Sequence, residues 1–221
     1  MLVQAEKRVV LSLPTALKSI GIVCAILGVL GTLLGVLAYF PDHPEFSIFR
    51  TYLSDIGDTP GWPQVFLNNT VVIISPLRYL ILVLLAMRLM QFGAGRNFVR
   101  SILMIGVITT FGTVLMTAVP FSFAPNVHKL GIAFYFLGVV ALQLLIGIRE
   151  WQLKTIPRLL PILSFLMVGV YIVFATLMML YEGGVVGRTT PVIWEWLCFV
   201  VSILWVLGQS IVLGNDKVSL G

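Results

Sequence analysis

Charged residues are scarce in this chain. Only 10% of its 221 residues are Asp, Glu, Lys or Arg, against roughly 25% in a typical soluble domain, whereas 59% are hydrophobic. A soluble globule of this size would have too few polar side chains to cover its surface. The composition therefore excludes a soluble enzyme and a disordered chain, and it predicts an integral membrane protein.

Cysteine and histidine are also rare. Cys24 and Cys198 both lie in apolar segments, which predicts buried free thiols and excludes a disulfide scaffold. With only His43 and His128, the spacing gives no sign of the three-ligand site that catalytic zinc requires. No glycine-rich phosphate loop or strained serine turn is present either, so we expect no metal or cofactor.

Long apolar runs are abundant instead. A transmembrane helix needs about 20 mostly apolar residues. Six segments meet this length, and Pro- and Gly-containing connections separate them. They predict an all-α fold, a single domain (residues 1–221) that forms an integral membrane bundle of six transmembrane helices: Ile20–Phe40, Thr70–Met90, Phe98–Val119, Leu130–Ile148, Leu159–Tyr181 and Val192–Leu213.

The basic residues predict the orientation. Lys and Arg concentrate in cytoplasmic segments of membrane proteins. If both termini are cytoplasmic, Arg50, Lys129 and Arg188 lie outside, Arg78 lies within a span, and ten basic residues lie inside: Lys7, Arg8, Lys18, Arg88, Arg96, Arg100, Arg149, Lys154, Arg158 and Lys217. The net charge of +5 thus reflects topology, and nothing indicates a nucleic-acid partner.

The longest connection, the outer loop Pro41–Asn69, is the first candidate for a functional region. Long ordered loops commonly carry function. Within this loop we expect a short interfacial helix whose apolar face comprises Phe46, Ile48, Phe49, Tyr52 and Leu53.

Arg78 is the most costly residue inside the predicted spans. A central Arg costs about 2.5–3.5 kcal/mol on insertion scales, so it should face protein or a wet cavity. Helical phase places Arg78 with Ser75 and Tyr79 on one polar face. Glu195, in the first turn of the sixth span, is its expected partner. The alternative is an Arg that extends to the surface or only fixes helix packing.

These residues suggest a polar pocket at the outer mouth of the bundle. The alternative is a capping network that merely closes the bundle. The candidate ligand-binding residues are Ser54, Asp55, Asn69, Arg78, His128 and Glu195.

Small residues form a stripe on the first span. Gly21, Gly28, Gly31 and Gly35 share one face, which lets another helix approach closely. Packing inside the bundle is the favoured interpretation. A homodimer or a partner membrane subunit on this face is the alternative.

Three short motifs resemble a known family. The segment Tyr52-Leu-Ser-Asp-Ile-Gly57, His128 at the start of the fourth span, and Glu195-Trp196 at the start of the sixth look like the DRAM/Sfk-type family of damage-regulated autophagy modulators. They are also similar to an uncharacterised prokaryotic six-helix family with a Ser-Asp/Glu-x-Gly segment. The resemblance implies a lipid-related role. It also implies residence in the cell membrane, or in endosomal or lysosomal membranes for a eukaryotic chain.

Together these features predict a protein that binds or organises lipid headgroups in an outward-facing pocket, with membrane lipids as its partners. One alternative is an intramembrane lipid hydrolase or transferase that uses Asp55, His128 and Glu195. An accessory subunit of a larger complex is another. A small transporter is less favoured, because the inner half of the spans is mostly Leu, Val and Met.

Overall fold

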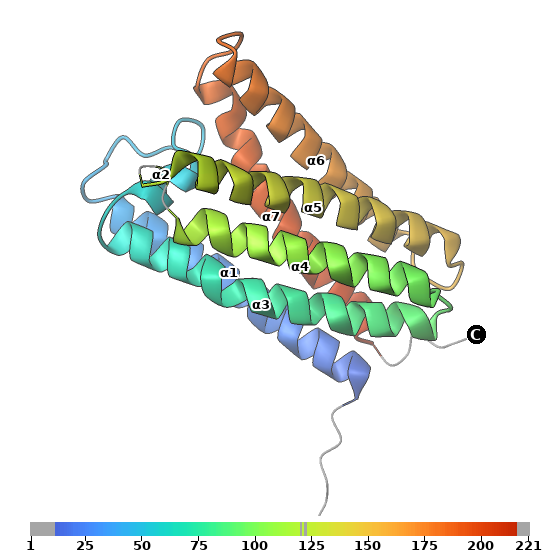
Figure 1. Cartoon of the computed structure of the whole chain (residues 1–221). Helices are drawn as coiled ribbons and strands as arrows, with labels where there is room; N and C mark the ends of the chain where they lie inside the picture. Colours follow the sequence, from blue (N-terminus) through green and yellow to red (C-terminus); the bar gives the residue numbers. More distant parts are fainter. Residues whose placement is uncertain (1–11, 120, 122, 216–221) are drawn as a thin grey trace, which may run out of the picture.

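The computed structural model describes residues 12–119, 121 and 123–215. The regular structure in this part of the chain is all helix, with no strand (Figure 1). Six helices are long and apolar enough to cross a membrane, and the short helix α2 is not. The prediction of an all-α bundle of six transmembrane helices is therefore confirmed. The helices are α1 (Leu13–Tyr39), α2 (Leu53–Asp58), α3 (Trp62–Gln91), α4 (Arg96–Ala118), α5 (Pro125–Gln152), α6 (Leu159–Glu182) and α7 (Thr189–Leu213).

The six long helices form a closed ring. Each packs against the next long helix in chain order, and α7 returns to pack against α1. The α6–α7 hairpin is tilted relative to the other four helices (Figure 1). Residues that face the centre of this ring line a space that we call the lumen.

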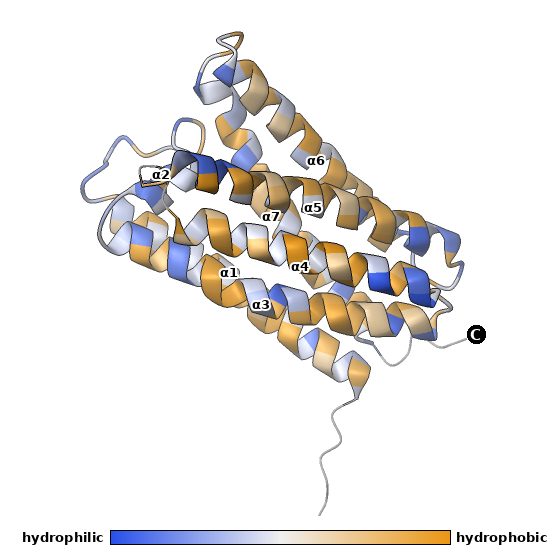
Figure 2. Cartoon of the chain, in the orientation of Figure 1, coloured by the Kyte–Doolittle hydropathy of each residue, from blue (hydrophilic) through white to orange (hydrophobic). Residues whose placement is uncertain are grey.

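The two ends of the bundle differ. One end carries α2 and the long α1–α3 connection, and we call it the loop end. The first and last described residues, Ser12 and Asn215, lie at the other end, which we call the termini end, where Gly214 lies close to Pro14 and Lys18. Hydrophobic residues cover the middle of the helices, and hydrophilic residues gather near both ends (Figure 2). Lys7, Arg8 and Lys217 lie outside the described residues, and the cytoplasmic position of the termini stays a prediction.

The connection at the loop end is shorter and more ordered than predicted. Helix α3 begins at Trp62 rather than at Thr70. Pro63 is compatible with this earlier start, because it lies in the first turn of the helix, where its missing N–H costs no hydrogen bond. The prediction of an interfacial helix from Phe46 to Leu53 is wrong. Residues 48–50 form a turn, no residue from 46 to 52 is helical, and the short helix α2 begins only at Leu53.

The glycine stripe of α1 packs inside the bundle. A side chain at Gly21 would collide with Ser210 of α7, and one at Gly31 would collide with Thr70 of α3. Gly28 and Gly35 are buried as well. The stripe therefore has its helix partners within one chain. Dimerisation through it would require the ring to open.

Candidate functional site

The short helix α2 is fixed to the mouth of the bundle by α7. The first N–H groups of any helix lack partners within that helix. Here the Glu195 carboxylate accepts a hydrogen bond from the backbone N–H of Leu53 (2.6 Å) and a longer one from Ser54 (3.4 Å). On its other side, Ile56 is fully buried against Tyr39 and Leu67. The carboxylate and the apolar contact together set the position of α2.

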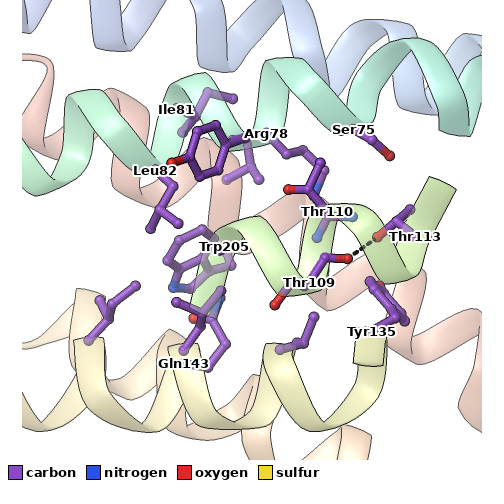
Figure 3. A pocket seen from close by; sticks show the side chains of 16 residues that line it. Ser75, Arg78, Ile81, Leu82, Thr109, Thr110, Thr113, Tyr135, Gln143 and Trp205 are labelled. Atoms are coloured by element: carbon purple, nitrogen blue, oxygen red, sulfur yellow. Dashed lines mark hydrogen bonds between the residues drawn. The ribbon is translucent and has the colours of Figure 1, made fainter. Parts of the chain in front are cut away.

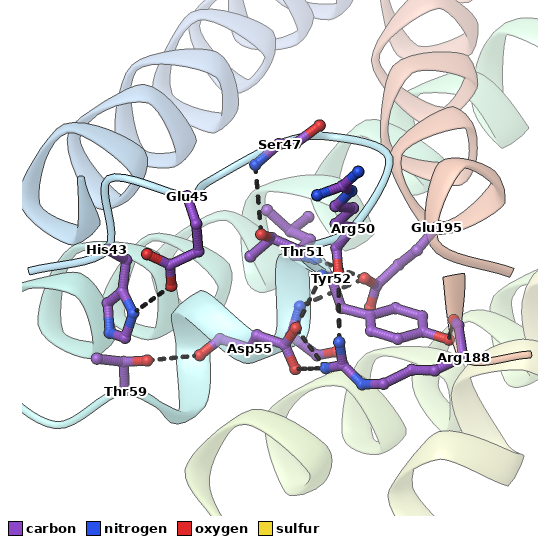
Figure 4. Close-up of polar contacts among 12 residues, drawn as sticks. His43, Glu45, Ser47, Arg50, Thr51, Tyr52, Asp55, Thr59, Arg188 and Glu195 are labelled. Atoms are coloured by element: carbon purple, nitrogen blue, oxygen red, sulfur yellow. Dashed lines mark hydrogen bonds and ion pairs between the residues drawn. The ribbon is translucent and has the colours of Figure 1, made fainter. Parts of the chain in front are cut away.

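An ion pair adds a second attachment between α2 and α7. Nη2 of Arg188 lies 2.7 Å and 2.6 Å from the two carboxylate oxygens of Asp55 (Figure 4). Asp55 also accepts a hydrogen bond from the backbone N–H of Tyr52 at 2.9 Å. The hydrogen bond to Asp55 raises the pKa of the Arg188 guanidinium. Arg188 therefore stays charged while it joins the loop to the start of α7.

Tyr52 packs beneath this ion pair. Its hydroxyl donates to the backbone carbonyl of Arg188 (2.8 Å), and the Arg188 guanidinium lies 4.9 Å from its ring centroid. The side chain is buried, and burial raises the pKa of Tyr52 to about 12. The phenol is thus neutral at physiological pH and acts as a hydrogen-bond donor.

A pocket of about 370 Å³ opens beside these residues. We call it the loop-end pocket. Charges of both signs line it. His43 lies 3.2 Å from the Glu45 carboxylate and stacks on the Tyr39 ring with 4.1 Å between centroids. Hydrogen bonds from the backbone and from His43 lower the pKa of Glu45. The full lining comprises Tyr39, His43, Glu45, Arg50, Thr51, Asp55 and Arg188.

The expected pair between Arg78 and Glu195 is wrong. Within the described part of the chain, the carboxylates in ion pairs are those of Glu45 and Asp55, and neither of them pairs with Arg78. Arg78 lies near the middle of α3, beside Tyr135, Tyr171 and Cys24. Glu195 binds the start of α2 instead, because that helix presents two free N–H groups close to it.

Arg78 does face inward, as its helical phase predicted. It lines a cavity of about 60 Å³ in the lumen, which we call the lumen cavity (Figure 3). Ser75 and Tyr79 line the same cavity, so the polar face predicted for this helix is confirmed. Residues of α4, α5 and α7 complete the lining, among them Thr109, Thr110, Thr113, Tyr135, Gln143 and Trp205.

Of the remaining candidate residues, Ser54 lies with Asp55 and Glu195, whereas His128 and Asn69 lie elsewhere. Ser54 is exposed at the start of α2, next to Asp55. A ring nitrogen of His128, Nδ1, lies 2.8 Å from the carbonyl of Val119, so His128 fastens the end of α4 to the start of α5. Asn69 is exposed on α3. Neither His128 nor Asn69 lines the loop-end pocket or the lumen cavity.

Sequence reasoning missed several lumen residues. Glu150 is fully buried, although its neighbour Arg149 made this segment look like a surface helix end. A signal was present, because Gln143 and Glu150 are seven residues apart and therefore share a helix face. Gln143 is buried too. The termini half of the lumen is thus more polar than predicted. The apolar inner half that disfavoured a transporter is therefore not what the structure shows.

Comparison with known proteins gives no assignment: no family model, curated protein or solved structure matches this chain.

Proposed function

We propose that the loop-end pocket binds the headgroup of a phospholipid, so that this multi-pass membrane protein recognises or organises lipids at one membrane surface. The main support is the pocket of about 370 Å³, which lies at the end of the bundle and carries charges of both signs. Sites for small molecules occupy about 300–1,000 Å³. The lumen cavity, at about 60 Å³, is too small for a headgroup.

The charges of the pocket suit a headgroup that has both a phosphate and an amine. Arg50 and Arg188 supply guanidinium groups, which bind phosphate oxygens well. In the described part of the chain, no hydrogen bond or ion pair engages the Arg50 guanidinium. Glu45 supplies a largely exposed carboxylate for an ammonium group, and Asp55, which is paired with Arg188, adds a second carboxylate to the lining. Phosphatidylethanolamine is therefore the lipid that we expect to bind best.

The outer surface of α1 provides a place for the acyl chains. Tyr39 is the last residue of α1 and lines the pocket. Leu30, Leu33 and Leu37 are exposed on the same helix. A lipid lying along this apolar surface would place its headgroup at the level of the pocket.

Lipid-dependent stability of the purified protein tests this proposal. In detergent, phosphatidylethanolamine should raise the melting temperature, and diacylglycerol, which lacks the headgroup, should not. Arg50→Gln removes a guanidinium that makes no internal hydrogen bond, so the fold should survive while the lipid effect is lost. Arg100→Gln, an exposed change at the termini end, is the matched control. An undiminished lipid effect in Arg50→Gln would refute the proposal.

The hydrolase alternative receives less support from the geometry. Asp55 is bound to Arg188, Glu195 to the start of α2, and His128 to Val119. These three groups do not surround a common cavity, so none is placed to activate another for attack on a lipid.

A further inference from the structure

The lumen holds a positive charge without a carboxylate partner. Arg78 lies 16 residues after Trp62 in a 30-residue helix, near the middle of the membrane span. The ion pairs among the described residues do not include it. An uncompensated charge at this depth is costly, and residues of this kind mark ion or substrate pathways.

The cavity beside Arg78 suits a small anion. The hydroxyl groups of Thr109, Thr113 and Ser75 donate to carbonyls of their own helices, so they have no hydrogen left for a ligand. The hydroxyls of Tyr135 and Tyr171 lie 2.8 Å apart and share one hydrogen bond, which leaves one phenolic hydrogen for another acceptor. Arg78 and one of these tyrosines can therefore donate to a ligand, and the side chains of Thr110, Tyr79 and Gln143 also line the cavity.

A buried carboxyl group is connected to the same cavity. Oε2 of Glu150 accepts from Ser164 (3.4 Å), and Ser164 accepts from the indole N–H of Trp205 (2.9 Å). Trp205 lines the lumen cavity, as does Gln143. Glu150 is fully buried, and its second oxygen has no hydrogen-bond partner.

Unsatisfied polar groups around Glu150 are compatible with a change in its protonation state. The amide oxygens of Gln209 and Gln143 are buried without a hydrogen-bond partner. Gln209 lies next to Glu150. In a membrane interior each unsatisfied polar group costs several kcal/mol, which favours an added proton, ion or water among these groups.

The cations on the surrounding helices are directed to other groups. Arg149 donates to the carbonyl of Gly93, Arg88 to that of Leu213, and Arg158 to that of Trp151. Arg96 and Arg100 of α4 are exposed. Tyr79, Tyr135, Tyr171, Cys24 and Cys198 are the other titratable groups that surround Arg78 and its tyrosine neighbours. Glu150 is thus a buried carboxyl group that Ser164 and Trp205 connect to the lumen cavity.

We propose that the lumen binds a small monovalent inorganic anion at Arg78, and that Glu150 couples this binding to the uptake of one proton. Charges interact strongly in a medium of low dielectric constant. A deprotonated Glu150 balances the charge of Arg78, whereas a protonated Glu150 leaves the lumen positive and attracts an anion. Because linkage is reciprocal, acid strengthens anion binding and the anion strengthens proton binding. This site is separate from the proposed headgroup site.

Chloride titration at two pH values tests this coupling. The purified protein is held in gluconate buffer at constant ionic strength, and chloride binding is followed by calorimetry and by melting temperature. Wild type should bind chloride more tightly at about pH 5 than at about pH 8, by a factor of about 5–150. Glu150→Gln, which is permanently neutral, should bind tightly at both pH values. Arg78→Gln should not bind chloride at either.

Three further variants keep the test decisive. If Arg78→Gln fails to fold, Arg78→Lys keeps the charge and should retain weaker, pH-dependent binding. Glu182→Gln, an exposed carboxyl at the loop end of α6, and Arg50→Gln, in the loop-end pocket, should both behave as wild type. Chloride binding that is absent from wild type, or that persists in a folded Arg78→Gln, would overturn the anion site. A pH dependence that persists in Glu150→Gln would overturn the coupling.

Discussion

The carboxylate of Glu195 lies 2.6 Å from the backbone nitrogen of Leu53. A residue in the second turn of a transmembrane helix thereby caps a helix of only six residues that lies 142 positions earlier in the chain. Together with the pair between Asp55 and Arg188, this contact holds the lining of the loop-end pocket against α7. The geometry of the pocket therefore depends on α7 as much as on the loop.

Replacing Glu195 should loosen the pocket. Glu195→Ala leaves the N–H groups of Leu53 and Ser54 without their acceptor, at a cost of about 1–3 kcal/mol. Trypsin should then cleave faster after Arg50, which lies in the freed segment. Glu195→Gln retains an acceptor oxygen and should give an intermediate rate, and Glu182→Ala should cleave as wild type does. Equal cleavage rates for all four proteins would show that Glu195 does not hold the loop.

Stability should fall in alkali because of Tyr52. Its pKa in the folded protein is about 12, against an ordinary value of 10.0. The folded state therefore holds the phenolic proton more tightly than the unfolded state does. This contribution is complete below pH 10 and is lost as pH rises towards 12, so the free energy of unfolding should fall over that range.

Tyr52→Phe isolates that contribution. The variant should be less stable near neutral pH by about 1 kcal/mol, because the hydrogen bond to the Arg188 carbonyl is lost. Its stability should also fall less steeply than that of wild type above pH 10, as measured by denaturant unfolding in detergent. Curves that run parallel over the alkaline range would contradict this assignment.

The contact between α4 and α5 should tolerate no added methyl group at Gly112. A Cβ there would lie 2.6 Å from the backbone nitrogen of Tyr135 and 2.8 Å from the carbonyl of Gly131. Backbone atoms cannot rotate away, so Gly112→Ala should destabilise the protein by about 1–3 kcal/mol. Gly169→Ala adds the same methyl group where no atom lies within 4 Å, and it should leave the melting temperature nearly unchanged. Equal melting temperatures for the two variants would contradict the close packing of α4 and α5.

The transmembrane helices could be predicted from the sequence because a continuous apolar segment is stable in a membrane as a helix, in which the backbone N–H and C=O groups bond to each other. Their starts were harder to place. Pro63 and Pro125 suggested loops, yet both lie in the first turn of a helix. Periodicity gave the inward face of Arg78 correctly, because phase within a helix does not depend on where that helix begins.

The partner of Arg78 could not be predicted, because depth along the bundle depends on where each helix begins. Counted from Thr70, Arg78 lay within reach of Glu195. With α3 beginning at Trp62 and α7 at Thr189, the two residues are 16 and six positions from their helix starts. At 1.5 Å per residue this offset is about 15 Å for parallel helices, which is too long for an ion pair. The loop-end pocket also depends on turns at residues 43–52, which have no periodic pattern.

An experimental structure of the protein in nanodiscs that contain phosphatidylethanolamine would test the central claim most directly. We predict headgroup density in the loop-end pocket, with the phosphate nearest Arg50 and Arg188 and the amine nearest Glu45 or Asp55. In Arg50→Gln that density should be weak or absent. A wild-type pocket that contains no lipid density, in a map that resolves lipids elsewhere around the helices, would contradict the claim.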